Sequence, residues 1–135
     1  MDRSAYDDYL AKFNARDYEG ILAYYADEME LVFAGYRFTS KDAVRKFYGF
    51  FHQYVAEQIE VRRFVGDEST VAIEVDVRLE GLQDLTPQRL AAEGLDRLVG
   101  LAAGQVVHIP QFIHYHLAGG KIVGAYCAVF DAPQG

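Results

Sequence analysis

Tryptophan is absent from this sequence, cysteine occurs once and proline three times in 135 residues. Cys127 has no second cysteine to pair with, so neither a disulfide framework nor a cysteine-rich zinc site is expected, and a reducing, cytoplasmic setting fits best. Apolar runs approaching the ~20 residues of a membrane-spanning helix are also absent. The first ten residues, MDRSAYDDYL, are acidic and lack an apolar segment, so we expect no signal peptide.

Positive charge is scarce as well. Lysine and arginine together number 13 against 20 aspartate and glutamate residues, which gives a formal net charge of −7. Nucleic acids are bound through basic side chains that neutralise phosphates, and anionic membrane surfaces attract the same side chains. We therefore expect no nucleic-acid partner and no membrane partner.

Aromatic side chains are abundant by contrast. Ten tyrosines and nine phenylalanines bring the aromatic fraction to 14%, within an apolar fraction of 51% that is ordinary for a globular protein. Tyrosine can line a cavity with an apolar ring while presenting a hydroxyl at a chosen point. The length predicts one domain over residues 1–135 with a core of its own.

The first third of the chain has helical spacing. Apolar side chains recur at i, i+3, i+4 and i+7 at Tyr6, Tyr9, Leu10 and Phe13. Ser4 with Asp7 resembles a capping box at the start of this helix. Asp17 and Ser40 are suitable N-caps for two further helices, and a short strand is predicted over residues 29–33 between them.

The period changes to two after Glu57. Strands are predicted over 58–65, 70–79, 105–117 and 121–130, the last two joined at Ala118-Gly119-Gly120. Residues 81–104 interrupt this pattern, and Pro87 is placed to open a helix that runs to about Leu101. Helices first and hairpinned strands later predict an α+β fold, with helices packed on one face of an antiparallel sheet.

Two segments carry a resemblance to a known family. FNARDYEGILAYYADEMEL near the start and LAGGKIVGAY near the end look like the superfamily of ketosteroid isomerases and SnoaL-like polyketide cyclases. The matching positions are Asn14, Asp17, Tyr25, Ala26 and Asp27, and then Gly120, Lys121 and Ile122. The resemblance covers roughly residues 4–130 and implies a cystatin-like, nuclear-transport-factor-2-like cone: a curved antiparallel sheet wrapped on three N-terminal helices, with 81–104 as an insertion. These motifs mark the fold better than the function, because the fold hosts many activities.

Ketosteroid isomerase combines a carboxylate base with an oxyanion hole made of a tyrosine and a protonated aspartate. The resemblance implies that Tyr9 is the oxyanion hydrogen-bond donor and that Tyr25 and Tyr48 support it. The position of the base holds Phe33, and the position of the protonated aspartate, counted back from the Gly-Lys turn, holds Phe112. Both carboxylates are therefore missing, and steroid isomerisation by the isomerase route is not expected. All three tyrosines also lie on apolar helix stripes, where they could serve as core aromatics alone.

The stretch QFIHYHL, residues 111–117, holds two histidines that share one side of a strand. By resemblance, Phe112, His114 and His116 face into the cone, where His114 could act as an acid or base. The alternation gives a contrary hint, since the other face is the more apolar one, with Ile109, Ile113, Tyr115 and Leu117. Metal binding with His108 or His52 is open but matches no known motif. Polar lining without chemistry is the remaining alternative.

These observations lead to one functional prediction and one alternative. We expect a pocket protein for a small apolar ligand with a carbonyl or phenol, and, if it is an enzyme, isomerase, cyclase or dehydratase chemistry with Tyr9 and His114 and with no cofactor or metal. Ligand-lining positions are predicted at Tyr25, Tyr48, Phe33, Phe51, Phe112, His116, Ile73 and Val75. A homodimer through the outer sheet face is also expected. The alternative is a ligand-binding or interaction module without catalysis, which the missing carboxylates favour.

Overall fold

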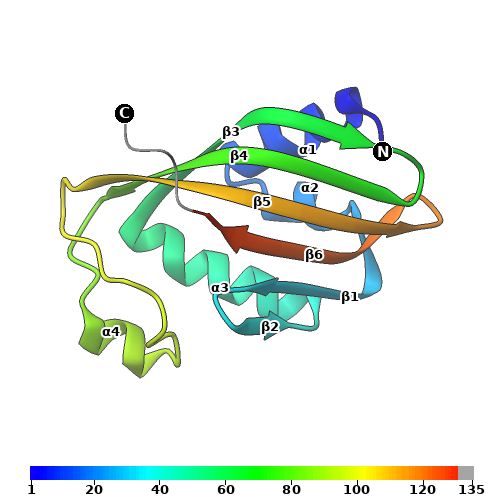
Figure 1. The fold of residues 1–135 in the computed structure, drawn as a ribbon. Helices are drawn as coiled ribbons and strands as arrows, with labels where there is room; N and C mark the ends of the chain where they lie inside the picture. Colours follow the sequence, from blue (N-terminus) through cyan, green and yellow to red (C-terminus); the bar gives the residue numbers. More distant parts are fainter. Residues whose placement is uncertain (131–135) are drawn as a thin grey trace.

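A curved six-stranded sheet wraps around the N-terminal helices in the computed structural model, which describes residues 1–130 (Figure 1). The elements in chain order are α1 (Arg3–Asn14), α2 (Tyr18–Leu22), β1 (Tyr25–Phe33), β2 (Tyr36–Phe38), α3 (Lys41–Tyr54), β3 (Val55–Gly66), β4 (Thr70–Gly81), α4 (Pro87–Ala92), β5 (Val106–Ala118) and β6 (Lys121–Val129). The predicted α+β class and the cone are confirmed. None of the helices within residues 1–130 is long and apolar enough to cross a membrane.

The strand order is β2-β1-β6-β5-β4-β3. All neighbouring strands run antiparallel except β1 and β6, which pair in parallel. Gly119 and Gly120, with φ of 58° and 77°, form the turn between β5 and β6 in the left-handed conformation that glycine adopts without strain. The predicted hairpin is therefore present.

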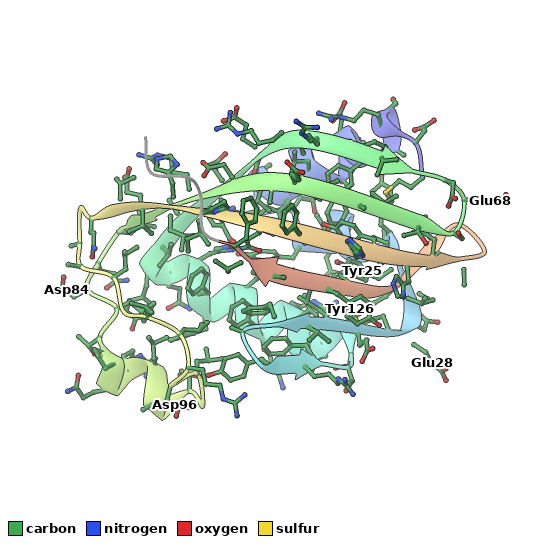
Figure 2. The ribbon with its side chains drawn as sticks, viewed as in Figure 1. Tyr25, Glu28, Glu68, Asp84, Asp96 and Tyr126 are labelled. Atoms are coloured by element: carbon green, nitrogen blue, oxygen red, sulfur yellow. The ribbon has the colours of Figure 1, made fainter. Side chains whose placement is uncertain are left out.

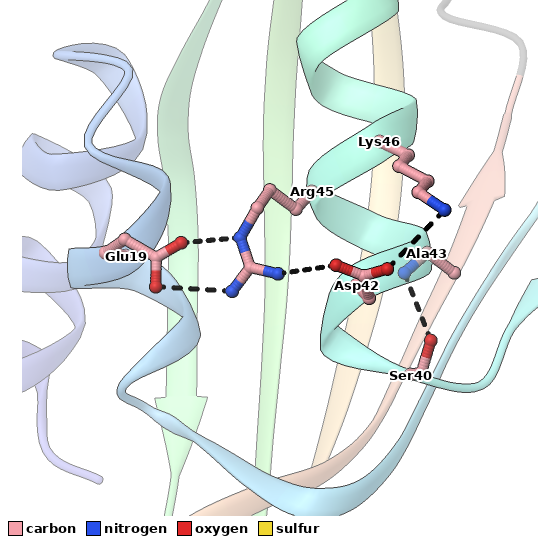
Figure 3. A network of polar contacts seen from close by, with 6 residues as sticks. All are labelled: Glu19, Ser40, Asp42, Ala43, Arg45 and Lys46. Atoms are coloured by element: carbon pink, nitrogen blue, oxygen red, sulfur yellow. Dashed lines mark hydrogen bonds and ion pairs between the residues drawn. The ribbon is translucent and has the colours of Figure 1, made fainter.

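Two of the three predicted helix caps are confirmed. The Asp17 side chain accepts a hydrogen bond from Gly20 N at 2.9 Å, and Ser40 Oγ accepts one from Ala43 N at 3.0 Å (Figure 3). The predicted capping box at Ser4 is wrong, because α1 begins earlier. Asp2 has an extended backbone and accepts from Ala5 N at 2.8 Å, so it is the N-cap.

Arg45 connects the second and third helices on the surface (Figure 3). Its guanidinium donates to both carboxylate oxygens of Glu19, at 2.5 Å and 3.2 Å, and to Asp42 at 3.0 Å. Burial does not strengthen these contacts, since Glu19 is exposed and solvent screens its charge, so each adds little to stability. The network orients α2 against α3, whose side chains line the cavity described below.

The insert between β4 and β5 is less helical than the sequence pattern predicts. Its helix α4 ends at Ala92 instead of near residue 101, and Gly94 follows with a φ of 73°. The remainder is irregular and is held by backbone hydrogen bonds in both directions between Leu85 and Leu101. A separate apolar cluster fastens the insert to α3 and β3: Phe47, Val55, Leu85, Leu90, Leu95 and Leu101.

The main core lies between the concave face of the sheet and the helices. On β4 and β5 the buried residues alternate with exposed or partly exposed ones, as a sheet with one covered face requires. Four buried tyrosines, which we call the tyrosine core, meet here: Tyr6, Tyr9, Tyr25 and Tyr115. Their hydroxyls pair at 3.0 Å, Tyr6 with Tyr115 and Tyr9 with Tyr25. The tyrosine core is thus closed and satisfied by its own members.

Candidate functional site

A cavity of about 450 Å³ opens on the concave side of the sheet, at the strand ends remote from the β5–β6 turn. Ligand pockets in proteins usually measure about 300–1,000 Å³, so the size suits a small molecule. The lining residues are Phe13, Leu31, Phe33, Ala34, Phe47, Tyr48, Phe51, Glu57, Ile59, Val77, Leu79, Leu98, Ile109, Gln111, Ile113, Cys127, Ala128 and Val129. We call this space the inner cavity.

The inner cavity has two unlike walls. Rings from α1, α3 and the end of β1 make one wall, where Phe33 and Phe47 lie 5.1 Å apart and Phe47 stacks on Phe51 at 5.5 Å. Branched aliphatic side chains of β3, β4 and β5 make the other wall, including Ile59, Val77 and Ile109. An aromatic wall facing an aliphatic one suits a flat, largely apolar molecule.

Four polar side chains interrupt these walls: Tyr48, Glu57, Gln111 and Cys127. Burial, with the Glu57 carboxylate as the second cause, holds the pKa of Tyr48 well above its ordinary value, so its hydroxyl keeps its proton. Burial and the same carboxylate raise the pKa of the Cys127 thiol to about 12. Both groups are therefore neutral at neutral pH. Within residues 1–130, Glu57 is the one acidic residue of the lining.

Glu57 belongs to a chain of hydrogen bonds that the sequence analysis did not find. Its Oε1 lies 2.8 Å from His52 Nε2, and His52 Nδ1 lies 2.7 Å from the Tyr18 hydroxyl. The His52 side chain is 4% exposed and the Glu57 side chain 15%. The His52 ring also stacks on Tyr18 and on Tyr48, with centroids 5.7 Å and 5.1 Å apart. Two hydrogen bonds and two ring contacts thus fix the imidazole.

The local sequence explains how these groups meet. Tyr48 and His52 are four residues apart on α3, which places them on one face of the helix. Strand β3 follows α3 without a loop, and Glu57 takes an inward position between Val55 and Ile59. Asn14, at the end of α1, holds this part of β3 by bonding the N–H and C=O of Ile59 at 3.1 Å and 3.3 Å.

A signal for Glu57 was present in the sequence. In VAEQIEV, residues 55–61, the carboxylate occupies the apolar phase of an alternating strand. The predicted strand starts only at residue 58, which leaves Glu57 outside it. The strand in fact starts at Val55, directly after the helix.

The predicted inward orientation of the histidines on β5 is wrong. Phe112, His114 and His116 are exposed on the convex face, whereas Ile113, Tyr115 and Leu117 are buried. All three side chains are affected together, because neighbouring residues of a strand point to opposite faces. An assignment that is off by one residue therefore moves every side chain to the other face. The alternation of apolar residues had indicated the observed orientation, and the count carried over by resemblance had not.

Two shallow depressions lie on this convex face. They measure about 510 Å³ and 300 Å³ and share Phe112 and His114 in their linings. Both are more open to solvent than the inner cavity. His114 and His116 are thus separated by the sheet from Tyr9, so a joint site of His114 and Tyr9 is not formed. The predicted homodimer through this face stays a prediction.

The predicted oxyanion donor, Tyr9, belongs to the tyrosine core. It is 5% exposed, its hydroxyl pairs with Tyr25, and neither residue lines the inner cavity. Burial raises the pKa of Tyr9 to about 12 and that of Tyr25 well above its ordinary value. Tyr48 is the member of the predicted tyrosine group that reaches the cavity.

Of the other predicted lining residues, some line the inner cavity and others do not. Phe33 and Phe51 line the inner cavity. Ile73 and Val75 point to the concave side, but they are buried within the core and do not line the cavity, where Val77 and Leu79 take that place. Among residues 1–130, no three histidine, cysteine, aspartate or glutamate side chains lie together as a metal site would require.

The Glu57 side chain is 15% exposed, unlike the carboxylates that Figure 2 labels. Glu28, Glu68, Asp84 and Asp96 are labelled there at the periphery of the molecule, and all four are exposed. A carboxylate between apolar walls needs a partner to offset the cost of its burial. His52 is that partner.

The profile of the SnoaL-like domain matches residues 6–125. The chain belongs to the SnoaL-like domain family. This assignment agrees with the resemblance seen in the sequence, and the match includes the whole insert at 81–104. No curated protein matches the chain significantly.

Solved structures of related proteins share the fold of this SnoaL-like chain. A candidate polyketide cyclase from Pseudomonas putida is 22% identical, with a TM-score of 0.70, over 93% of this chain and 87% of that one. A candidate ketosteroid isomerase from Kribbella flavida is 15% identical, with a TM-score of 0.65, over 98% and 80%. An LEH-like epoxide hydrolase from M. tuberculosis is 12% identical, with a TM-score of 0.68, over 94% and 80%. At these identities the likeness establishes the nuclear-transport-factor-2-like fold alone.

Proposed function

We propose that this SnoaL-like protein binds a small, neutral, flat molecule with a carbonyl or phenol group in the inner cavity and converts it by isomerase, cyclase or dehydratase chemistry. The observation that carries this proposal is the inner cavity itself, which is apolar on two sides and has a few converging polar groups. The names of the fold relatives, which include cyclases, an isomerase and an epoxide hydrolase, agree with this class of ligand.

The Tyr48 hydroxyl is the proposed donor to the ligand oxygen. Tyr48 lines the inner cavity, and its hydroxyl forms no hydrogen bond with the described residues. No side-chain polar atom among these residues is both buried and unpaired, so this hydroxyl is accessible. A phenol in an apolar site stabilises negative charge that develops on a carbonyl oxygen more than water does, because the local dielectric constant is low. This assigns to Tyr48 the role that the resemblance suggested for Tyr9.

The charge of the lining supports a neutral ligand. Among the residues that the structure describes, Glu57 is the only acidic side chain of the lining, and none of the lining side chains is basic. A ligand carboxylate would place a second negative charge in the same apolar space. Free acids should therefore bind more weakly than their neutral esters or ketones.

A thermal-shift screen tests the binding proposal. The panel should hold neutral ketones and phenols of two to four fused rings, each beside a carboxylic acid of similar shape. A ligand present at ~100 times its Kd adds about 2.7 kcal/mol to the stability of the folded state. We expect the neutral compounds to raise the melting temperature and the matched acids to raise it less. Larger shifts with the acids than with the neutral compounds would contradict the proposal.

Leu98 and Val99 supply a matched pair of variants. Leu98, in the insert, lines the inner cavity, whereas the next residue, Val99, is 90% exposed and does not. Leu98→Trp should reduce the ligand-induced shift, and Val99→Trp should leave it unchanged. Equal effects of the two substitutions would place the ligand elsewhere.

A non-catalytic binding protein is the second candidate. Phe33 lines the inner cavity where the isomerase resemblance expects the base, so that carboxylate is missing from the site. Binding without any turnover across the panel would favour this candidate.

A further inference from the structure

We propose that Glu57 is the acid/base of the inner cavity, and that His52 and Tyr18 are positioning residues that hold its carboxylate and stabilise it in both protonation states. This inference rests on the proposed function, since it names the group that would move protons in the same cavity. It replaces the expectation for His114, which lies on the other face of the sheet. It also places a carboxylate in the cavity, although both carboxylate positions of the isomerase resemblance hold phenylalanine.

The geometry divides the two oxygens of Glu57 between two tasks. Oε1 is bonded to His52 Nε2 at 2.8 Å, and among the described residues Oε2 has no hydrogen-bond partner. Glu57 is also a lining residue of the inner cavity. One oxygen is therefore anchored, and the other is available to a ligand atom.

The burial of this pair is a second argument. A carboxylate and an imidazole that are almost withdrawn from solvent cost free energy, and apolar side chains would pack in the same places without that cost. The neighbours Val55 and Ile59 show that this strand face is otherwise apolar. A purely structural role does not call for a carboxylate at position 57.

The hydrogen-bond chain can accommodate one additional proton. In the proposed resting arrangement, His52 Nε2–H donates to Glu57 Oε1 and Nδ1 accepts from the Tyr18 hydroxyl. The same hydroxyl lies 3.3 Å from the backbone carbonyl of Tyr48. When Glu57 takes up a proton on Oε2, His52 Nε2–H still donates to Oε1 and Nδ1 still accepts from Tyr18, so no group loses its partner.

The step that these groups support is an enolisation. Glu57 Oε2 removes a proton from the carbon next to the ligand carbonyl, and that C–H bond breaks. Its electron pair forms the new C=C bond while the C=O π pair moves to oxygen, where the Tyr48 hydroxyl donates a hydrogen bond. Returning the proton from Glu57 to another carbon completes an isomerisation, and expelling a β-hydroxyl as water with that proton completes a dehydration.

Proton exchange of 2-tetralone in D₂O tests the inference without knowledge of the natural substrate. This neutral bicyclic ketone enolises readily, and replacement of its α-protons by deuterium can be followed by NMR. Binding is measured separately by titration. We expect the protein to accelerate exchange above the buffer rate, and Glu57→Gln to lower the accelerated rate by about 100-fold or more with an unchanged Kd.

Glu60→Gln is the matched control, because Glu60 lies on the same strand with an exposed side chain that pairs with Arg62 at 3.3 Å. Its exchange rate should equal that of the unmodified protein. His52→Asn should lower the exchange rate by about tenfold at an unchanged Kd, since it misplaces the base without removing it. A loss of binding together with rate would indicate a structural role for His52 and contradict its role as a positioning residue.

The two proposals fail in different ways. No binding of 2-tetralone or of the wider panel contradicts the proposed function. Binding with exchange at the buffer rate, or an equal rate in Glu57→Gln, leaves the binding function in place and overturns the acid/base inference. The resting hydrogen-bond chain is tested without any ligand by the ¹⁵N shifts of the His52 ring. They should show a protonated Nε2 and an acceptor Nδ1, and the opposite tautomer would overturn the proposed directions of the two hydrogen bonds.

Discussion

The tyrosine core and the inner cavity lie side by side on the same concave face of the sheet, but they differ in how their polar groups are hydrogen bonded. In the tyrosine core, every hydroxyl pairs with another at 3.0 Å and none reaches the cavity. In the inner cavity, the Tyr48 hydroxyl and one oxygen of Glu57 have no partner among the described residues. The first region is complete by itself, and we propose that a ligand completes the second.

The comparison shows that residue type alone does not identify a functional site. Tyr9 and Tyr48 are both tyrosines on apolar helix stripes, but only Tyr48 presents its hydroxyl to a cavity. No side-chain polar atom within residues 1–130 is both buried and without a hydrogen-bond partner, so the Tyr48 hydroxyl is accessible. Its accessibility beside an apolar cavity supports the proposed binding of a ligand there.

The largest expected effect is a slow alkylation of Cys127, which lies on β6 and lines the inner cavity. Burial and Glu57 raise the pKa of this thiol from about 9 to about 12, which lowers the thiolate fraction at pH 8 by roughly 1,000-fold. Alkylation by iodoacetamide at pH 8 should be correspondingly slower in the folded protein than in urea, and Glu57→Gln should make it faster. Labelling at the rate of the unfolded chain would contradict the buried setting of the thiol.

The second-largest expected effect is a loss of folding stability at high pH, caused by the tyrosine core. Burial raises the pKa of Tyr9 to about 12, above the value of about 10 in the unfolded chain. Because the folded pKa is the higher one, the stability that this group contributes is complete below pH 10 and is lost as the pH rises from 10 toward 12. Two pKa units correspond to about 2.7 kcal/mol. Urea unfolding at a series of pH values should show this decline, and a flat profile up to pH 12 would contradict it.

Removing one hydroxyl from each region sharpens the comparison. Tyr9→Phe leaves the Tyr25 hydroxyl buried without its partner, and should lower the free energy of unfolding by about 1–3 kcal/mol. Tyr48→Phe deprives no protein group of a partner and should change stability by less than about 0.5 kcal/mol. Urea unfolding of both variants measures the difference, and equal losses would mean that Tyr48 is also a core residue.

The smallest expected effect is on affinity. Tyr48→Phe removes one proposed hydrogen bond to the ligand, worth about 1 kcal/mol, and should weaken the binding of a neutral ketone about fivefold. Tyr9→Phe should leave the Kd unchanged in protein that remains folded. Isothermal titration of both variants checks this, and the reverse ranking would return the donor role to Tyr9.

Much of the fold could be read from the sequence because its signals are local. The caps at Asp17 and Ser40, the alternation on β4 and the diglycine turn each determine structure within a few residues, and each is present. The helix in the insert was predicted too long, because the pattern of apolar residues there serves packing against α3 in an irregular segment.

The site was harder to predict because it depends on contacts between distant residues. Tyr18 and His52 are 34 positions apart, and neither the pairing of His52 with Glu57 nor the closing of Tyr9 onto Tyr25 follows from spacing alone. For His114 the sequence itself held the better indication. The alternation of apolar residues on β5 correctly indicated which face is buried. The positions transferred from distant relatives indicated the opposite face.

Methyl NMR during titration with a neutral polycyclic ketone tests the central claim most directly. The account predicts shifts at methyl groups that line the inner cavity, such as Ile59, Val77 and Ile109, with Val71 and Ile122 in the neighbouring core unaffected. Shifts confined to Val65 and Ala72, which border the convex depression beside His114, would contradict it and place the ligand on the other face of the sheet.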